Sequence, residues 1–330
     1  MRAVVCKEFG PPESLVVEEL PSPVPGPGQV LVRVEACGIN FPDTLIIENK
    51  YQFKPSLPFS PGGEASGVVS AVGPGVTQWK PGDRVIAMCG WGGFVEEMAI
   101  DGSRLMRTPD AMDSVTAAGF TMTYGTSHHA LKDRAALRPG ETLLVLGAAG
   151  GVGLAAVEIG KAMGARVIAA ASSPDKLEVC RRYGADEVID YAKESLKDRV
   201  KELTDGAGAD VIYDPVGGDY FDAAFRTIAW EGRYLVVGFA AGRIPQLPVN
   251  LALLKGCQLV GVFWGAFTAR DPERNRRNLD ELAAWCAEGR LKPLVSATYR
   301  LEDVAVALRA MLDRKVTGKV VLVTGEGKTA

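Results

Sequence analysis

The stretch that decides the fold reads Thr142-Leu-Leu-Val-Leu-Gly-Ala-Ala-Gly-Gly-Val-Gly-Leu154. Its first part, Thr142 to Leu146, is an unbroken apolar run, typical of a strand that is buried on both faces of a parallel sheet. In the turn that follows, Ala148, Gly150 and Gly153 occupy the three positions of a G-x-G-x-x-G pattern. Missing side chains there let the backbone approach a pyrophosphate, while the N–H groups of the next helix face the phosphates.

A glycine-rich turn by itself is weak evidence, because glycine also marks ordinary tight turns and close helix packing. The surrounding sequence strengthens the interpretation. An apolar helix follows the turn, and a second strand, 166 to 170, arrives at the spacing of a βαβ unit. We therefore predict a dinucleotide site whose phosphates contact the turn at Ala149, Gly150, Gly151, Val152 and Gly153.

Composition limits the classes of function. The 330-residue chain has a formal net charge of −3, which argues against broad electrostatic binding to nucleic acid or to an anionic membrane. No apolar run is long enough to span a bilayer, and the chain begins as a short strand instead of a signal peptide, so we expect a cytoplasmic protein. The six cysteines form no C-x-x-C pair, which favours buried reduced thiols.

The two halves of the chain differ in pattern. Residues 1 to 118 read as strands and Pro/Gly-rich turns, whereas strand–helix alternation follows from 119 to 264. We predict a six-stranded doubly wound α/β sheet over 119–265 and a β-rich domain made of 1–118 with 266–330, because the last apolar strand, Lys319 to Val323, resembles the first half. The predicted strands of the α/β domain are Thr142–Leu146, Arg166–Ala170, Glu187–Ile189, Asp210–Tyr213, Arg233–Gly238 and Gln258–Phe263.

Taken together, several motifs make the chain similar to the medium-chain dehydrogenase/reductase superfamily, in particular its zinc-free NADPH:quinone oxidoreductase branch. The resemblance covers nearly every residue and implies a GroES-like catalytic domain beside a Rossmann domain. It is carried by Cys37-Gly-Ile-Asn-Phe-Pro-Asp43, Pro61-Gly-Gly-Glu-Ala-Ser-Gly67, Val76 to Val85, Ala148 to Gly153, Asp210 to Gly218, Gly261-Val-Phe-Trp-Gly265 and Thr317-Gly-Lys-Val-Val321.

The residues that replace the zinc ligands of the zinc-dependent relatives predict a protein without a bound metal. Where that branch has a zinc-ligating Cys this chain has Asn40, and where it has a His ligand this chain has Gly63, beside the retained Glu64. One carboxylate cannot hold Zn²⁺ in a tetrahedral catalytic site. The structural zinc loop is also missing, since Cys89 stands alone. The two histidines, His128 and His129, would point about 100° apart on a helix, which suits no shared metal.

The end of the second strand favours NADPH over NADH. An NAD site usually has an acid there to bind the ribose hydroxyls, whereas this chain reads Ala169-Ala-Ala-Ser-Ser173. Asp175 is a rival, but Ser173-Pro174-Asp175 is typical of a helix cap. We expect Ser172, Ser173 and Lys176 to hold the 2′-phosphate; the alternative for Lys176 is a solvated helix lysine.

The resemblance supplies further cofactor residues. It places Tyr191 at the adenine end, Thr126 at the nicotinamide carboxamide, where a buried capping Thr is the alternative, and Lys319 among the cofactor contacts. Other residues at the carboxyl ends of the later strands would shape the nicotinamide end. These are Val216, Gly217, Gly238, Phe239, Phe263 and Trp264.

Three polar residues are candidates for catalysis: Asn40, Asp43 and Tyr51. Asn40 has the chemistry to donate to a developing enolate or quinol oxygen, or it is a turn residue. Tyr51 matches the tyrosine of related enoyl thioester reductases, or it lines the pocket mouth without transferring a proton. We expect Asp43 to brace the Asn40 loop or a neighbouring Arg more than to act as an acid.

These features predict an NADPH-dependent reductase of quinones or related conjugated carbonyl compounds. An enoyl or acryloyl thioester reductase is the alternative, and it requires a basic entrance formed by residues such as Lys50, Lys54 or Arg270. A non-catalytic, crystallin-like NADPH-binding protein is the third interpretation. Because Gln258 to Phe263 would leave an exposed apolar edge, we also expect a homodimer joined at that strand.

Overall fold

The computed structural model describes residues 1–325 and separates into two compact units. The first unit contains Met1–Met122 and the segment that begins at Pro293, and the second contains Thr123–Lys292. The chain returns to the first unit at residue 293, later than the predicted return at 266. The helix Pro272–Ala287 therefore belongs to the second unit, where it packs on its neighbour Trp264–Arg270.

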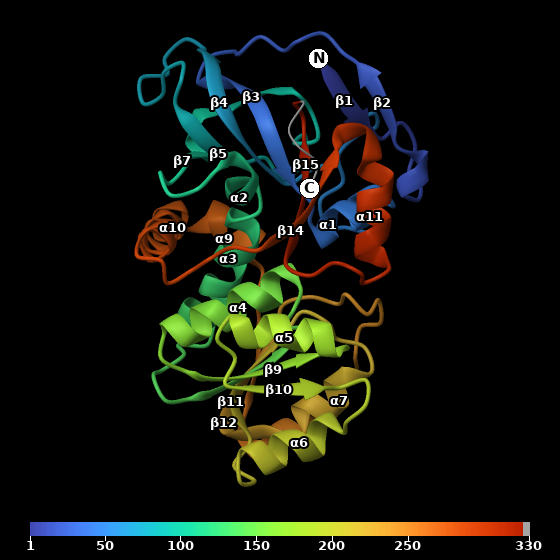
Figure 1. The fold of residues 1–330 in the computed structure, drawn as a ribbon, viewed down its shortest axis with the longest axis vertical. Coiled ribbons are helices and arrows are strands. Elements are labelled where there is room, and N and C mark those ends of the chain that lie inside the picture. Colours follow the sequence, from blue (N-terminus) through green and yellow to red (C-terminus); the bar gives the residue numbers. More distant parts are fainter. Residues whose placement is uncertain (326–330) are drawn as a thin grey trace. The chain divides into compact units, whose positions relative to one another are not determined.

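The first unit is built on a seven-stranded sheet (Figure 1). Its centre is β3, Gln29–Gly38, whose alternating side chains are buried on the core face. The terminal strand β15, Lys319–Val323, pairs antiparallel with β3, which confirms that the last apolar run completes this sheet. The other elements are β1 (Arg2–Val5), β2 (Val16–Glu19), α1 (Phe41–Ile46), β4 (Glu64–Val72), β5 (Arg84–Met88), β6 (Glu97–Asp101), β7 (Leu105–Arg107), α2 (Ser114–Ala118), β14 (Val295–Arg300) and α11 (Val304–Leu312).

The second unit is the predicted six-stranded parallel sheet, in the order β10-β9-β8-β11-β12-β13. Connections from β8 run toward β9 and β10, and those from β11 run the opposite way. This makes the adjacent pair β8 and β11 the topological switch point, where open α/β sheets bind ligands. The strands are β8 (Thr142–Leu146), β9 (Arg166–Ala171), β10 (Glu187–Asp190), β11 (Ala209–Asp214), β12 (Ile228–Val236) and β13 (Gln258–Gly261).

Helices connect these strands and cover the sheet. Figure 1 shows α4 and α5 lying over the strands of this unit, and right-handed crossovers place α7 and α8 on the opposite face. The helices of this unit are α3 (Thr121–His128, beginning at the unit boundary), a π-helical turn (His129–Arg134), α4 (Gly151–Ala162), α5 (Pro174–Arg182), α6 (Leu196–Leu203), α7 (Tyr220–Phe225), α8 (Val249–Lys255), α9 (Trp264–Arg270) and α10 (Pro272–Ala287).

Two of the predicted strands, β12 and β13, differ from the structure by more than one residue at an end, and β12 also ends at Val236, two residues before the predicted end. β12 begins at Ile228, five residues before the predicted start, and bends at Glu231, which has a φ of 58°. β13 ends at Gly261, because Phe263 already caps helix α9.

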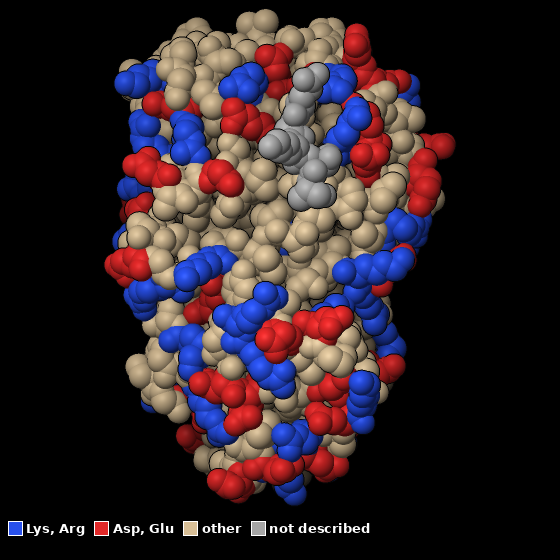
Figure 2. Space-filling view, in the orientation of Figure 1, with Lys and Arg blue, Asp and Glu red and all other residues tan. Residues whose placement is uncertain are grey.

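The surface carries no large area of one charge sign on the face drawn in Figure 2, where acidic and basic side chains are interspersed. Among the helices of residues 1–325, none combines the length and the apolar character needed to cross a bilayer.

Candidate functional site

The glycine-rich turn leaves the start of helix α4 open. Gly150 is the N-cap, with an extended backbone and no side chain to cap the helix. The first helical bond runs from Leu154 N–H to the Gly150 carbonyl at 2.8 Å. The N–H groups of Gly151, Val152 and Gly153 precede that bond and point out of the helix start. They provide donors and a positive dipole end for an anion.

Glycine is needed at two positions of the turn for different reasons. A Cβ on Gly153 would lie 2.3 Å from the Gly147 carbonyl oxygen, so close packing of helix and strand requires glycine there. A Cβ on Gly150 would meet only that same oxygen, at 3.4 Å, and otherwise open space. The protein itself therefore does not fill the space in front of Gly150. This cradle fits a pyrophosphate group, which a side chain at Gly150 would obstruct.

The end of β9 carries the predicted 2′-phosphate residues. Ser173 caps α5 by accepting a bond from Lys176 N–H at 3.5 Å, which confirms the predicted cap, and Asp175 lies in the first helical turn. The Ser173 hydroxyl keeps its proton for another acceptor. Ser172 is exposed beside it. No acid lies at the end of this strand, where an NAD-selective site would have one.

An aromatic pair marks the predicted adenine end. The Tyr191 ring lies 4.2 Å from the Tyr220 ring, centroid to centroid, at an interplanar angle of 41°. The resemblance predicted Tyr191 for the adenine end, and the structure places Tyr220, which begins helix α7 and was not predicted, beside it. The signal for Tyr220 is a tyrosine directly after the Gly217-Gly218-Asp219 turn.

A buried carboxylate shapes the loop after β11. Asp214 Oδ1 accepts the N–H groups of Val216 and Gly217, each at 2.8 Å, and Oδ2 accepts the Tyr234 hydroxyl at 2.6 Å. These bonds hold the backbone in the turn, where Gly217 has a φ of 61°. Sequence reasoning missed Asp214. An acid that ends a buried strand just before a Gly-Gly turn is the signal that would have found it.

The same loop meets the segment after β12. Ala241 N–H donates to the Val216 carbonyl at 2.9 Å, and a Cβ on Gly217 would lie 2.9 Å from the Phe239 ring. A Cβ on Gly238 would lie 3.2 Å from the Pro215 carbonyl oxygen. The structure thus brings together Val216, Gly217, Gly238 and Phe239, four residues predicted for the nicotinamide end.

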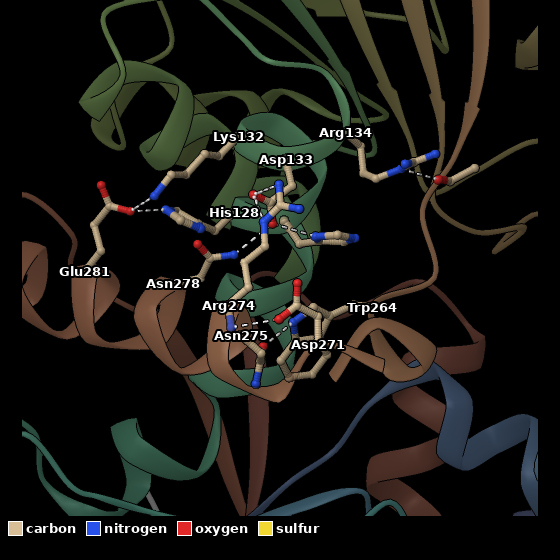
Figure 3. A network of polar contacts seen from close by, with 12 residues as sticks. His128, Lys132, Asp133, Arg134, Trp264, Asp271, Arg274, Asn275, Asn278 and Glu281 are labelled. Carbon is tan, nitrogen blue, oxygen red and sulfur yellow. Dashed lines mark hydrogen bonds and ion pairs between the residues drawn. The ribbon is translucent and has the colours of Figure 1, made fainter. Parts of the chain in front are cut away.

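The end of β13 presents one of its two predicted aromatic residues. Trp264 is buried, and its indole N–H donates to Asn275 Oδ1 at 3.0 Å (Figure 3). Its ring packs so tightly on Gly125 that a Cβ there would lie 2.5 Å from it. Phe263 is 46 % exposed. Trp264 therefore anchors the start of helix α9 against Gly125, next to Thr126. The predicted contact between its ring and the cofactor is not supported by this packing.

In the first unit, three side chains form a buried polar cluster that we call the Lys319 cluster: Asn40, Glu64 and Lys319. Lys319 Nζ donates to Asn40 Oδ1 at 2.7 Å, to Glu64 Oε1 at 2.9 Å and to the Ile39 carbonyl at 2.8 Å. An ammonium group has three donors, and all three are used. Lys319 thus has a structural partner set of its own, which disfavours the predicted contact with a cofactor.

The Lys319 cluster also fixes the orientation of the Asn40 amide. Its oxygen faces the ammonium, and its nitrogen donates to Glu64 Oε1 at 3.0 Å and to the Gly38 carbonyl at 3.2 Å. Both N–H groups of the amide are therefore engaged within the protein. The expectation that Asn40 donates to a substrate oxygen is not supported by this geometry, because no donor is left over. Asn40 instead positions the Glu64 carboxylate.

Asp43 and Tyr51 lie near this cluster. Asp43 Oδ2 accepts the Asn40 backbone N–H at 2.7 Å, so the carboxylate braces the Asn40 loop, and no arginine pairs with it among residues 1–325. Burial raises the pKa of Asp43 to about 7. Burial, assisted by the nearby Asp43 charge, also raises the pKa of Tyr51. The half-buried Tyr51 hydroxyl makes no hydrogen bond to another residue of the described chain.

Comparisons with known proteins agree with this architecture. Residues 26–110 match the alcohol dehydrogenase GroES-like domain, and residues 151–284 match the domain described as zinc-binding dehydrogenase. The quinone oxidoreductase-like protein 2 homolog of Nematostella vectensis is 46 % identical over 327 residues, covering 98 % of this chain and 89 % of that protein. The chain belongs to the quinone oxidoreductase branch of the medium-chain dehydrogenase/reductase superfamily.

Two solved structures of the superfamily are informative. Escherichia coli quinone oxidoreductase, complexed with NADPH, has a TM-score of 0.91 and 29 % identity, and the match covers 98 % of this chain and all of that one. The CurK enoyl reductase has a TM-score of 0.88 and 25 % identity, covering 98 % and 99 %. The chain therefore shares its fold both with a quinone oxidoreductase and with an enoyl reductase.

A zinc ion does not fit the residues of the Lys319 cluster. Glu64 Oε1 is bonded to the ammonium and the amide, and Oε2 accepts Met122 N–H at 2.8 Å. Both acceptor sites of Oε1 are used, one site of Oε2 remains, and Asn40 and Gly63 supply neither thiolate nor imidazole to complete a tetrahedral zinc site. Across residues 1–325, no group of three or more His, Cys, Asp or Glu side chains is arranged to hold a metal ion.

Proposed function

We propose that the protein is a zinc-independent, NADPH-dependent oxidoreductase that transfers a hydride to quinones or related conjugated carbonyl compounds. The observation that carries the proposal is the open cradle at Gly150, in front of the uncapped start of α4. The absence of an acid at the end of β9 favours NADPH, since a 2′-phosphate meets no repulsion there. The names of the relatives support the quinone as acceptor.

The roles of the residues follow from their contacts. NADPH supplies the hydride when bound, and the protein supplies orientation and a proton. Asp214 holds the Val216–Gly217 turn in shape, and Ser172, Ser173 and Lys176 bind the 2′-phosphate. Tyr51 donates a hydrogen bond to the acceptor oxygen, a role that suits a hydroxyl without a protein partner and with a raised pKa.

A second candidate function is reduction of enoyl thioesters. It is favoured by the fold shared with an enoyl reductase and by Arg270, an exposed guanidinium in the second unit. Of the other two basic residues considered for an anionic carrier, Lys50 pairs with Glu48 and Lys54 is exposed.

The test compares oxidation of NADPH and NADH by chelator-treated protein with four acceptors: 1,4-benzoquinone, 9,10-phenanthrenequinone, a simple enone and acryloyl-CoA. Quinone-dependent NADPH oxidation that survives the chelator is the expected result. Turnover of the thioester alone would assign the protein to the enoyl reductases. Tight NADPH binding without turnover of any acceptor would support the crystallin-like role.

We also propose a homodimer joined at β13. Exposed apolar side chains lie on β13, on α8 and at the bend of β12: Trp230, Val249, Leu253, Leu254 and Leu259. The backbone N–H and C=O groups of Leu259 and Gly261 face the open edge of β13. The Gly261 carbonyl already accepts a hydrogen bond from Arg134 Nε at 3.0 Å. Pairing with a second copy would therefore centre on Leu259. Light scattering at micromolar concentration tests this, and a monomer would contradict it.

A further inference from the structure

A pocket of about 280 Å³ lies within the second unit, away from the glycine-rich turn in sequence. Of its residues, only Phe263, predicted for the nicotinamide end, and Arg270, considered for the thioester alternative, have an assigned functional role. It is formed by the π-helical turn after α3, the end of β13 and helices α9 and α10. Its side chains include His129, Arg134, Phe263, Phe267, Arg270 and Arg274. Figure 3 shows two of these, Arg134 and Arg274, together with Asp133.

The single acid in the pocket wall, Asp133, is fully engaged. Its Oδ1 accepts Arg274 Nε at 3.0 Å and Nη2 at 2.7 Å, and its Oδ2 accepts Asn278 Nδ2 at 2.8 Å and pairs with His129 Nδ1 at 2.7 Å. Burial acts to raise the pKa of Asp133, but the bonds from His129, Asn278 and Arg274 outweigh it and hold that pKa at about 2. Asp133 therefore stays ionised and offsets the charge of Arg274.

Two guanidinium groups remain without an acidic partner. Arg134 uses Nε for the Gly261 carbonyl, which fixes the side chain while its two terminal nitrogens bond to no residue of the described chain. Arg270, in the last turn of α9, has neither a hydrogen bond nor an ion pair within residues 1–325. A guanidinium presents paired N–H groups that match the two oxygens of a carboxylate. The pocket therefore has an excess of positive charge and donors of the right geometry for an anion.

The remaining wall is apolar. Phe263 is 46 % exposed, and Phe267 is held flat against His129, with ring centroids 3.9 Å apart and an interplanar angle of 14°. A bare inorganic anion would use the arginines but leave this apolar wall in water. An anion with a flat apolar body would use both features.

We propose that this pocket is a binding site for a small organic carboxylate with a planar apolar body, separate from the phosphate cradle at Gly150. Arg134 and Arg270 hold the carboxylate, and the body packs on Phe263 and Ala266. The site requires neither quinone turnover nor NADPH binding, so it stands or fails separately from the proposed function.

The experiment is isothermal titration of 2-naphthoate into the full-length protein, with and without saturating NADP⁺. We expect binding of one naphthoate per chain in both conditions, weakened by added salt because the pocket is open to solvent. Neutral 2-naphthalenemethanol and inorganic phosphate should each bind at least about tenfold more weakly, because each lacks one of the two recognised features. Naphthoate that is displaced by NADP⁺, or phosphate that binds as tightly as naphthoate, would overturn the proposal.

Matched variants locate the site. Arg270→Gln should weaken naphthoate binding at least about tenfold, since a charged hydrogen-bond partner is lost, and it should leave the fold intact because the side chain is exposed. Arg277→Gln is the control, as it removes an equal charge from an exposed position of α10 outside the pocket. Unchanged binding in Arg270→Gln and Arg134→Gln, or an equal loss in Arg277→Gln, would overturn the assignment.

Discussion

Lys319 Nζ lies 2.9 Å from Glu64 Oε1, and both side chains are buried, 6 % and 0 % exposed. The two residues are 255 positions apart in the chain, so this ion pair joins the terminal strand β15 to the first strand segment after the Pro61-Gly-Gly63 turn. A buried charge is tolerated only when it is paired and hydrogen-bonded, and here each partner satisfies the other.

Removing the ammonium should destabilise the first unit strongly. Lys319→Met leaves Glu64 as an unpaired buried charge, and we expect the free energy of unfolding to fall by about 3–5 kcal/mol. The double variant Lys319→Met with Glu64→Gln should be less destabilised than Lys319→Met alone, because the uncompensated charge is gone. Urea denaturation measures both.

The exposed pair Lys315–Asp313, 3.1 Å apart, provides the control. Lys315→Met should change the free energy of unfolding by less than about 1 kcal/mol. A Lys319→Met protein as stable as this control would contradict the role of the buried pair.

Asp43 should make stability depend on pH. Its pKa in the folded protein, about 7, lies above the value of 3.8 for a free carboxyl. Well below pH 3.8 the carboxyl is protonated in both states. As the pH rises from 4 to 7 the unfolded chain loses its proton while the folded chain keeps it, so the free energy of unfolding falls, on the order of 4 kcal/mol for this group alone. Urea denaturation at pH 5 and pH 7.5 measures the difference.

Asp43→Asn should flatten this pH dependence, even if its stability at pH 5 is lower. The same substitution at exposed Asp313 should leave the slope unchanged. An Asp43→Asn protein with the slope of the wild type would show that Asp43 is ionised throughout the range.

The two glycines of the turn should separate folding from cofactor binding. Gly150→Ala should cost less than about 1 kcal/mol of stability, because the backbone is extended and the Cβ meets open space. It should weaken NADPH binding at least about tenfold, or about 1.4 kcal/mol, because the methyl group enters the phosphate cradle. Fluorescence titration with NADPH measures the affinity.

Gly153→Ala is the counterpart. Its Cβ would lie 2.3 Å from a carbonyl oxygen, so we expect a loss of about 1–3 kcal/mol in stability. If Gly150→Ala bound NADPH as tightly as the wild type, the pyrophosphate would lie elsewhere.

Cofactor preference should respond to the charge at the end of β9. Ser172→Asp introduces the acid that this position lacks, and repulsion of the 2′-phosphate should weaken NADPH binding at least about tenfold while NADH binding is maintained or improved. Paired titrations with both nucleotides measure the ratio. The control is Glu178→Asp, at an exposed position in the middle of α5, which introduces an aspartate nearby without changing the net charge. An unchanged ratio in Ser172→Asp would place the 2′-phosphate away from this strand end.

Tyr51→Phe should reduce kcat about 100-fold with little change in stability, because the hydroxyl has no bonded partner to lose within the described residues and is proposed to act on the acceptor. The KM for NADPH should stay the same. Steady-state kinetics with 1,4-benzoquinone, together with a thermal unfolding curve, separates the two effects. An unchanged kcat would assign Tyr51 to the lining of the pocket mouth.

Local sequence patterns determined most of the fold. The run Thr142–Leu146 became the central strand β8, and the glycines after it opened helix α4, because the pattern of apolar residues and the conformation of a tight turn are set mainly by neighbouring residues. Ser173 became a helix cap for the same reason. The apolar run Lys319–Val323 also indicated a strand of the first unit's sheet, where it lies between β14 and β3.

The polar contacts were decided by the tertiary structure. No spacing in the sequence shows that Lys319 reaches Asn40 and Glu64, and it is this contact that uses the Asn40 donors and removes Asn40 from direct substrate binding. Trp264 likewise appeared as a cofactor contact until its ring was seen packed on Gly125. The physical reason is the same in each case: which donors remain free and which rings remain exposed depends on segments brought together by folding, and their separation along the chain carries no signal of it.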